Sequence, residues 1–222
     1  ICDDDSADRI ILSNDNFLCR DKVVIGAEGL YPKAAKSSWL RHCFPSHDVS
    51  FALGLRNPAT LVPSLLRSLS DEDRAESLAL LDLDQLSWAD VVAEIIEANP
   101  DANLLIWAHE DTPFIWSEII REITAHDPYL TLDGAYDMMG QILSPDGIAR
   151  LLTFLADHPD ITETRRRKTL SAFLGTHAMV DEIEEEIDLP GWTLDTITDL
   201  TVAYDDDIDR IRAMPRVTLV EP

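Results

Sequence analysis

The sequence predicts an α/β fold, a small parallel sheet with flanking helices followed by a mostly helical C-terminal part. Two short apolar runs, Val49–Leu55 and Leu104–Trp107, have the length and composition of buried strands. Helical patterns with clear start signals stand between these runs. Beyond residue 125 the strand signals fade, so we expect an α/β core over residues 1–125 and a helical part over 126–222, packed on the same core.

Four strands are expected in the α/β part. Ile10–Ser13 is a short apolar run after a polar turn, and Val23–Ile25 is a weaker second candidate. Val49–Leu55 is apolar without a break, which is typical of a strand buried on both faces of a parallel sheet. Leu104–Trp107 is the last strand of this part, and a helical pattern covers Lys33–Cys43.

The helices are expected where capping residues or proline precede an apolar periodic stretch. In the first part these helices run from Pro58 to about Leu69, from the acidic turn after Ser70 through the apolar stretch Ser77–Leu86, from Trp88 to Ala98 after Ser87, and from Thr112 to about Ala125. In the second part they run from Ser144 to about Asp157, from Thr162 to about Glu186, and from Thr193 to about Met214, with Val217–Val220 as a terminal strand or tail.

The composition excludes several partners. The chain has 42 acidic and 18 basic residues and a formal charge of −24, so its field repels nucleic acid and anionic lipid. No apolar run approaches the ~20 residues that span a bilayer. Three cysteines without metal or CxxC spacing favour a reduced, cytoplasmic compartment with free thiols. The first residue, Ile1, begins no signal-peptide pattern, so an internal start is expected.

One motif carries specific chemistry. The strand Val49–Leu55 is followed by Arg56-Asn57-Pro58 and, eight residues after the arginine, by Ser64. Arg56 therefore lies where a parallel strand gives way to a helix, at the edge of the sheet where ligands of open α/β folds bind. A guanidinium there can hold a phosphate through two hydrogen bonds. The alternative is a surface arginine that pairs with a carboxylate, plus an ordinary helix serine.

The same stretch resembles a known family. The resemblance runs through Ile11–Leu18, Leu40–Pro45 and Val49–Ser64, with shorter likenesses at Leu86–Trp88, at Ile106–Trp107 with Glu110, and at Leu189–Trp192. These stretches resemble the P-loop sulfotransferases, most closely the bacterial sulfotransferase-like proteins and the heparan N-sulfotransferase type. The resemblance implies a P-loop NTP hydrolase/sulfotransferase-like scaffold. It also implies that Arg56 and Ser64 bind the 3′-phosphate of the sulfate donor PAPS.

The chain departs from this family in one respect. The family's phosphate loop is a glycine-rich turn with lysine and threonine or serine, and none of the eight glycines here lies in such a turn. We expect that loop, with its strand and helix, upstream of Ile1, or else a degenerate member of the family. A sheet without this strand would expose an edge, so association of copies or a further covering segment is expected.

Sulfate transfer also needs a base for the acceptor's proton. Asp15, after the first expected strand, is the candidate by position, and the alternative is a loop aspartate or a helix cap. We expect no metal, because His109–Asp111 lacks a second ligand cluster and Asp205–Asp209 lacks the pattern of a calcium loop. The aspartates of Asp205–Asp209 spread around a helix and are expected to be solvated charge. The basic run Arg165–Lys168 is expected to form salt bridges within the chain or with a partner.

Two functions follow from the sequence. The first is a sulfotransferase-like protein that transfers sulfate from PAPS to an unknown small-molecule or glycan acceptor. The second is a catalytically inactive scaffold or protein-binding module derived from that fold, in which the acidic surface and the helical C-terminal part serve a protein partner.

Overall fold

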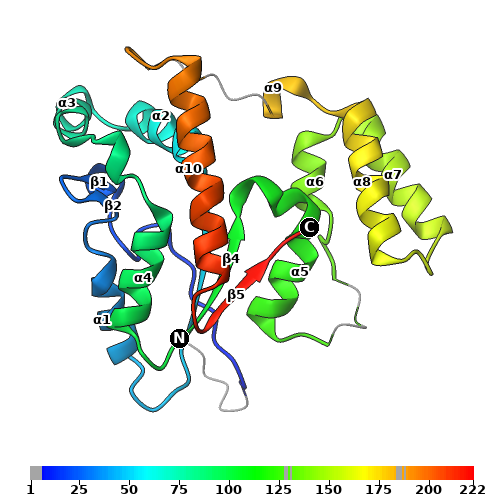
Figure 1. Cartoon of the computed structure of the whole chain (residues 1–222). Coiled ribbons are helices and arrows are strands. Elements are labelled where there is room, and N and C mark those ends of the chain that lie inside the picture. The colour runs from blue at the N-terminus through cyan, green and yellow to red at the C-terminus, as the bar shows by residue number, and fades with distance from the viewer. Residues whose placement is uncertain (1–6, 128–129, 131, 184–186, 188) are drawn as a thin grey trace. The chain divides into compact units, whose positions relative to one another are not determined.

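A computed structural model describes residues 7–127, 130, 132–183, 187 and 189–222 (Figure 1). Contacts divide the chain into two compact units. Unit 1 comprises residues 1–108 and 187–219, and unit 2 comprises residues 109–186 and 220–222. The expected parts, 1–125 and 126–222, divide the chain along the sequence, whereas unit 1 also takes in the last long helix. No helix among the described residues is long and apolar enough to cross a membrane.

Unit 1 contains a three-stranded parallel sheet, apart from the last residue of its third strand, and this sheet confirms the α/β class. Its strands stand in the order β3 (Ser50–Leu55), β4 (Asn103–Ala108) and β5 (Val217–Val220). In β3 and β4, Ser50 lies opposite Asn103 and Leu55 lies opposite Ala108. The backbone N–H of Leu104 donates to the carbonyl of Arg216 at 2.9 Å, where β5 begins.

The strand predicted at Val49–Leu55 is confirmed, but its burial on both faces is wrong. Leu55 is fully buried, whereas Ser50 and Ala52 are exposed. The run is an alternation of large and small residues: Phe51, Leu53 and Leu55 contribute to the core, and Ser50, Ala52 and Gly54 fall on the other face. Small residues make the run look continuously apolar without filling a second core.

Glycine at position 54 follows from what lies beside it. Gly54 is opposite Trp107 in the register of β3 and β4, and a Cβ atom at Gly54 would approach the indole ring to 3.0 Å. The indole therefore lies over the space that a larger residue in β3 would occupy.

The predicted strand Ile10–Ser13 is wrong. These residues form no strand, and the side chains of Ile10, Ile11 and Leu12 are each more than half exposed. A strand needs a neighbour for its N–H and C=O groups, and none pairs with this segment in the described part of the chain. Nearby, β1 (Ile25–Gly26) and β2 (Gly29–Leu30) form a short antiparallel pair, and β1 overlaps the weaker candidate Val23–Ile25 only at Ile25.

The helices of unit 1 are η1 (Asp21–Val23), η2 (Ala34–Lys36), α1 (Ser37–His42), α2 (Pro58–Ser68), α3 (Asp71–Leu80), η3 (Leu83–Gln85), α4 (Trp88–Ala98) and α10 (Leu194–Arg212). Of these, α2, α3, α4 and α10 begin where capping residues predicted, and the helix expected over Lys33–Cys43 is divided into η2 and α1. The side chains of Asn57, Ser70, Ser87 and Thr193 accept hydrogen bonds from the first turns of α2, α3, α4 and α10. The helical pattern over Ser77–Leu86 breaks at Leu81, after which the chain forms η3.

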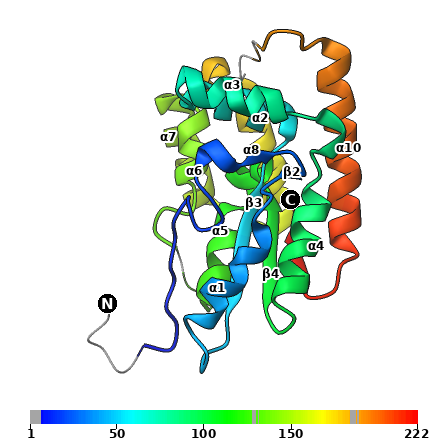
Figure 2. The ribbon, with the colours of Figure 1, turned by 90° about the vertical axis from the view of Figure 1, so that its left-hand side faces the viewer.

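The core of unit 1 joins distant parts of the sequence. Buried residues of α2, α4 and α10 pack with the sheet residues Leu55, Leu104 and Ile106 into one apolar cluster. The two views show α10 lying beside α4 (Figures 1 and 2). From α10 the cluster receives Leu200, Tyr204 and Ile211, which recur on one helix face.

A buried carboxylate joins α10 to α4. Asp207 is 5% exposed, and one of its oxygens accepts hydrogen bonds from the backbone N–H groups of Trp88 (2.6 Å) and Ala89 (3.2 Å). Its other oxygen accepts from the hydroxyl of Ser87 (3.1 Å) and from Arg210 (2.8 Å). Asp207 therefore satisfies N–H groups of the first turn of α4, which have no partner within that helix.

Unit 2 is helical. Its elements are η4 (His109–Asp111), α5 (Thr112–Thr124), α6 (Asp137–Ile142), α7 (Pro145–Asp157), α8 (Glu163–His177) and α9 (Val180–Ile183). The helix expected from Thr162 to about Glu186 stops at His177, and residues 184–186 lie outside the described residues. Met139, Leu143, Leu151 and Leu170 form its buried cluster.

An ion-pair network joins α5 to α8 in unit 2. Arg166, 9% exposed, donates to Glu118 at 2.6 Å and to both carboxylate oxygens of Glu163 at 2.6 and 2.8 Å. Arg167 also donates to Glu163, at 2.7 Å. Arg166 and Arg167 thus form the expected salt bridges, within the chain. Burial opposes ionisation of Glu163, but the hydrogen bonds and charges of the two arginines outweigh it and lower the pKa of Glu163.

We predict that Asp207→Asn destabilises unit 1 by roughly 2–4 kcal/mol. The amide keeps the shape of the side chain, but it removes the charge and an acceptor oxygen from the start of α4. Urea unfolding followed by tryptophan fluorescence measures the change. Asp206→Asn, at the exposed neighbour, should change stability little, and equal effects of the two substitutions would contradict the prediction.

We also predict a pH-dependent effect of Glu163→Gln. Because the folded pKa of Glu163 is lowered, its ionised form stabilises the protein above its ordinary pKa of 4.5, and this contribution is lost as the pH falls through the folded value. The variant should melt below the wild type at neutral pH, and the difference should close in acid. Melting temperatures of the variant and the wild type, measured from neutral to acid pH, test this prediction, and Glu122→Gln, at an exposed position, is the control. A difference that is constant with pH would refute the assignment.

Candidate functional site

The carboxyl end of β3 is held by side chains from two helices. The carbonyl of Leu55 accepts a hydrogen bond from the hydroxyl of Tyr204 in α10 at 2.9 Å. The next carbonyl, that of Arg56, accepts one from the indole Nε1 of Trp88 in α4 at 2.8 Å. Both carbonyls lie where the strand ladder ends, so these bonds fix the backbone from which the Arg56 side chain starts.

Arg56 and Ser64 lie on one side of α2. The half-buried side chain of Arg56 donates from Nε to the hydroxyl of Thr60 at 3.2 Å, and that hydroxyl donates to the carbonyl of Asn57 at 3.1 Å. Ser64 comes one turn after Thr60, and residues four apart are neighbours on a helix surface. The guanidinium therefore follows the helix face that carries both hydroxyls.

The N–H groups at the start of α2 are largely satisfied. Pro58 has none, the N–H of Ala59 donates to Asn57 Oδ1 at 2.9 Å, and those of Thr60 and Leu61 donate to the Asn57 carbonyl. The Asn57 amide in turn donates to the hydroxyl of Thr201 in α10 at 3.0 Å. An anion at this end of β3 would therefore meet the Arg56 guanidinium and the hydroxyls of α2.

Asp15, the candidate base, lies in an exposed turn. The strand that was expected to bring it to the edge of the sheet does not form. Among the described residues, no hydrogen bond or ion pair joins Asp15 to Arg56 or Ser64.

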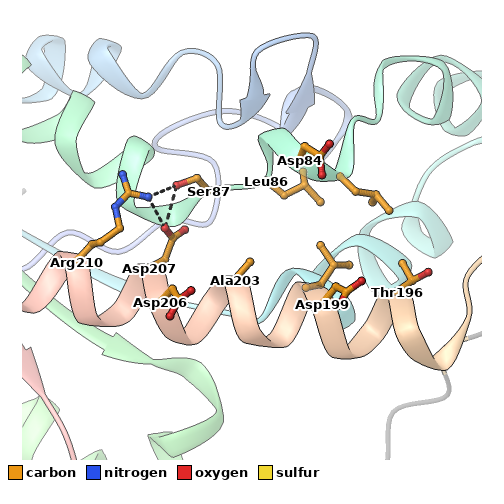
Figure 3. Close-up of a pocket in the computed structure, with 11 residues that line it drawn as sticks. Asp84, Leu86, Ser87, Thr196, Asp199, Ala203, Asp206, Asp207 and Arg210 are labelled. Atoms are coloured by element: carbon orange, nitrogen blue, oxygen red, sulfur yellow. Dashed lines mark hydrogen bonds and ion pairs between the residues drawn. The ribbon is translucent and has the colours of Figure 1, made fainter.

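A second feature of unit 1 is a groove along α10, with a cavity of about 520 Å³. We call it the α10 groove. One wall is α10, and the other is η3 with the start of α4 (Figure 3). It is lined by Leu83, Asp84, Leu86, Ser87, Thr196, Asp199, Leu200, Ala203, Asp206, Asp207 and Arg210.

The basic end of the α10 groove is already neutralised. Arg210 donates to Asp207 at 2.8 Å and to Asp90 at 3.0 Å. The hydrogen bond to Asp90, with the charges of the two carboxylates, raises the pKa of Arg210 above its ordinary value. This arginine therefore adds no net positive charge to the groove.

The remaining charges of the α10 groove are carboxylates. Asp84 and Leu86 lie across the hollow from Asp199 and Ala203 (Figure 3). Within the part of the chain that the structure describes, the carboxylates of Asp84, Asp199 and Asp206 make no hydrogen bond or ion pair. Their charges are therefore uncompensated by neighbouring side chains.

Sequence reasoning missed this groove. Asp205–Asp209 is expected to be solvated charge, and Asp205, Asp206 and Asp209 are exposed, but Asp207 is buried. A signal was present, because Leu200, Tyr204 and Ile211 mark one face of the helix at spacings of three or four, and position 207 falls on it.

The other candidate groups form no further site. In the described part of the chain, no three His, Cys, Asp or Glu side chains stand together as a metal-ligand set. Cys19 and Cys43 are free thiols as expected, and Cys2 lies outside the described residues. Burial, aided by the charge of Asp21, raises the pKa of Cys19 to about 11, which keeps its thiol protonated and a poor nucleophile.

Comparisons with known proteins identify no relative: no protein-family model, no curated protein and no solved structure matches the chain.

We predict that Tyr204→Phe lowers the free energy of unfolding of unit 1 by about 1–2 kcal/mol, because it leaves the Leu55 carbonyl without its buried donor. The ring remains, so packing in the core is preserved. Urea denaturation followed by circular dichroism measures the loss. A variant as stable as the wild type would show that this bond does not hold the end of β3.

Proposed function

We propose that this chain is a sulfotransferase-like protein of the P-loop type. Its β3–α2 junction binds the 3′-phosphate of PAPS, or of the product adenosine 3′,5′-bisphosphate. Arg56 supplies the charge and Ser64 a hydroxyl. The proposal rests on the residue pattern around Arg56 and on the position of this residue in an α/β fold, at the carboxyl end of a parallel strand.

The observation that carries the proposal is the course of the Arg56 side chain. Its Nε bond to Thr60 directs the guanidinium along the face of α2 that leads to Ser64. A guanidinium can hold a phosphate through two parallel hydrogen bonds, which is why Arg56 is the residue proposed to bind it. The hydroxyl of Ser64 adds a neutral donor, which costs little to desolvate compared with a second charge.

The proposal concerns binding of the donor through one phosphate. The residues at the junction fit a single phosphate group, and the glycine-rich loop that holds the sulfate-bearing end in this family has no counterpart among the eight glycines of the sequence. Asp15 stays outside the proposal, because no strand places it near Arg56. When bound, PAPS would supply an activated sulfate for transfer to an acceptor hydroxyl or amine.

The proposal predicts saturable binding of adenosine 3′,5′-bisphosphate and a loss of about 10- to 100-fold in affinity for Arg56→Ala, the range expected for charge-assisted hydrogen bonds. Ser64→Ala should weaken binding by a smaller factor, since it removes a neutral donor. Isothermal titration measures both affinities. A ligand that binds only the native state also raises the melting temperature, which gives an independent reading.

The matched control is Arg67→Ala. Arg67 is exposed in the last turn of α2, roughly 16 Å along the helix from Arg56, and its loss changes the net charge equally. Arg67→Ala should bind the nucleotide as the wild type does. An absence of binding by the wild-type chain, or equal losses in the two arginine variants, would refute the proposal.

A further inference from the structure

We propose that the α10 groove is a docking site for a basic amphipathic helix of a partner protein. The apolar side chains of that helix would lie between α10 and η3, and its lysines or arginines would pair with Asp84, Asp199 and Asp206. This site is separate from the nucleotide proposal and does not depend on it.

The shape of the groove favours an elongated occupant. Its α10 wall is built from Thr196, Asp199, Ala203, Asp206 and Arg210. These residues recur every three or four positions, so they form a straight ridge of roughly 21 Å along one side of the helix. Two helices pack when the ridge of one lies in the groove of the other, and such grooves accept the apolar face of an amphipathic helix.

The groove also offers apolar surface that an occupant could cover. Leu86, just after η3, and Leu200 of α10 line the groove but are already buried in the core, so the apolar surface that is still accessible comes from Leu83 of η3 and Ala203 of α10. Leu83 is half-buried, and Ala203, whose short side chain leaves room above the helix backbone, is exposed. Apolar side chains that enter between Leu83 and Ala203 would remove the remaining accessible surface of these two residues from water.

Charge complementarity indicates that the occupant of the groove is positively charged. Asp84 stands on one wall, and Asp199 and Asp206 stand on the other, all without a hydrogen-bond or ion-pair partner in the described residues. Arg210 is compensated by Asp207 and Asp90. A cationic helix would therefore relieve repulsion in a chain of formal charge −24, whereas an acidic or phosphorylated one would add to it.

The test measures binding of a synthetic helix of leucine and lysine, about 15 residues long to match Thr196–Arg210, by fluorescence anisotropy with the full chain. We expect saturable binding that weakens as salt is added. A peptide of equal charge with serine in place of leucine should bind at least about tenfold more weakly, because it lacks the apolar face.

Two double variants locate the site. Asp199→Asn with Asp206→Asn removes two carboxylates from the groove, and affinity should fall roughly tenfold. Asp195→Asn with Asp205→Asn removes the same charge from exposed positions of α10 outside the groove, and affinity should stay within about twofold. Ala203→Lys fills the groove and adds a like charge, so it should abolish binding while circular dichroism shows an unchanged fold.

Several results would overturn the inference. These are no saturable binding of the leucine–lysine peptide, equal losses in the two double variants, or equal affinity for the serine peptide, which would indicate attraction to the net charge alone. Arg56→Ala should bind the peptide normally. The peptide experiment can therefore be interpreted even if the chain does not bind the nucleotide, and the nucleotide experiment can be interpreted even if the chain does not bind the peptide.

Discussion

The hydrogen bonds of Asp207 are the interaction on which the rest of unit 1 depends. This carboxylate meets the free N–H groups at the start of α4, so one residue both caps a helix and joins it to α10. The same two helices supply Trp88 and Tyr204, which hold the carbonyls at the end of β3. The position of Arg56 and the wall of the α10 groove thus share one support, although they serve different proposed ligands.

Local signals predicted the elements, and non-local contacts determined how they are used. Ser70, Ser87 and Thr193 marked helix starts because a cap needs only the next few residues. Ile10–Ser13 has the local apolar pattern of a strand but forms none, because a strand also needs a neighbouring strand for its hydrogen bonds. The burial predicted for both faces of β3 was wrong because Ser50 and Ala52 are small enough to extend an apolar run although they are exposed.

The two candidate sites also differ in whether local sequence signals can reveal them. Arg56 could be singled out from the sequence because its position, directly after a strand and before a helix, is a local property. The α10 groove could not, because its walls are more than 100 residues apart and its surface exists only after they pack. In the sequence, Asp207 differs from its acidic neighbours Asp205, Asp206 and Asp209 only in its position on the apolar face of α10.

The order of synthesis gives the discontinuity of unit 1 a further consequence. Residues 109–186, which belong to unit 2, leave the ribosome before the helix that completes unit 1. Until α10 emerges, the N–H groups of Trp88 and Ala89 lack their acceptor, and the residues of α2 and α4 that pack on α10 are uncovered. The segment of unit 1 that is made first is therefore completed last, and in that interval exposed apolar surface favours self-association, which the net charge of −24 opposes.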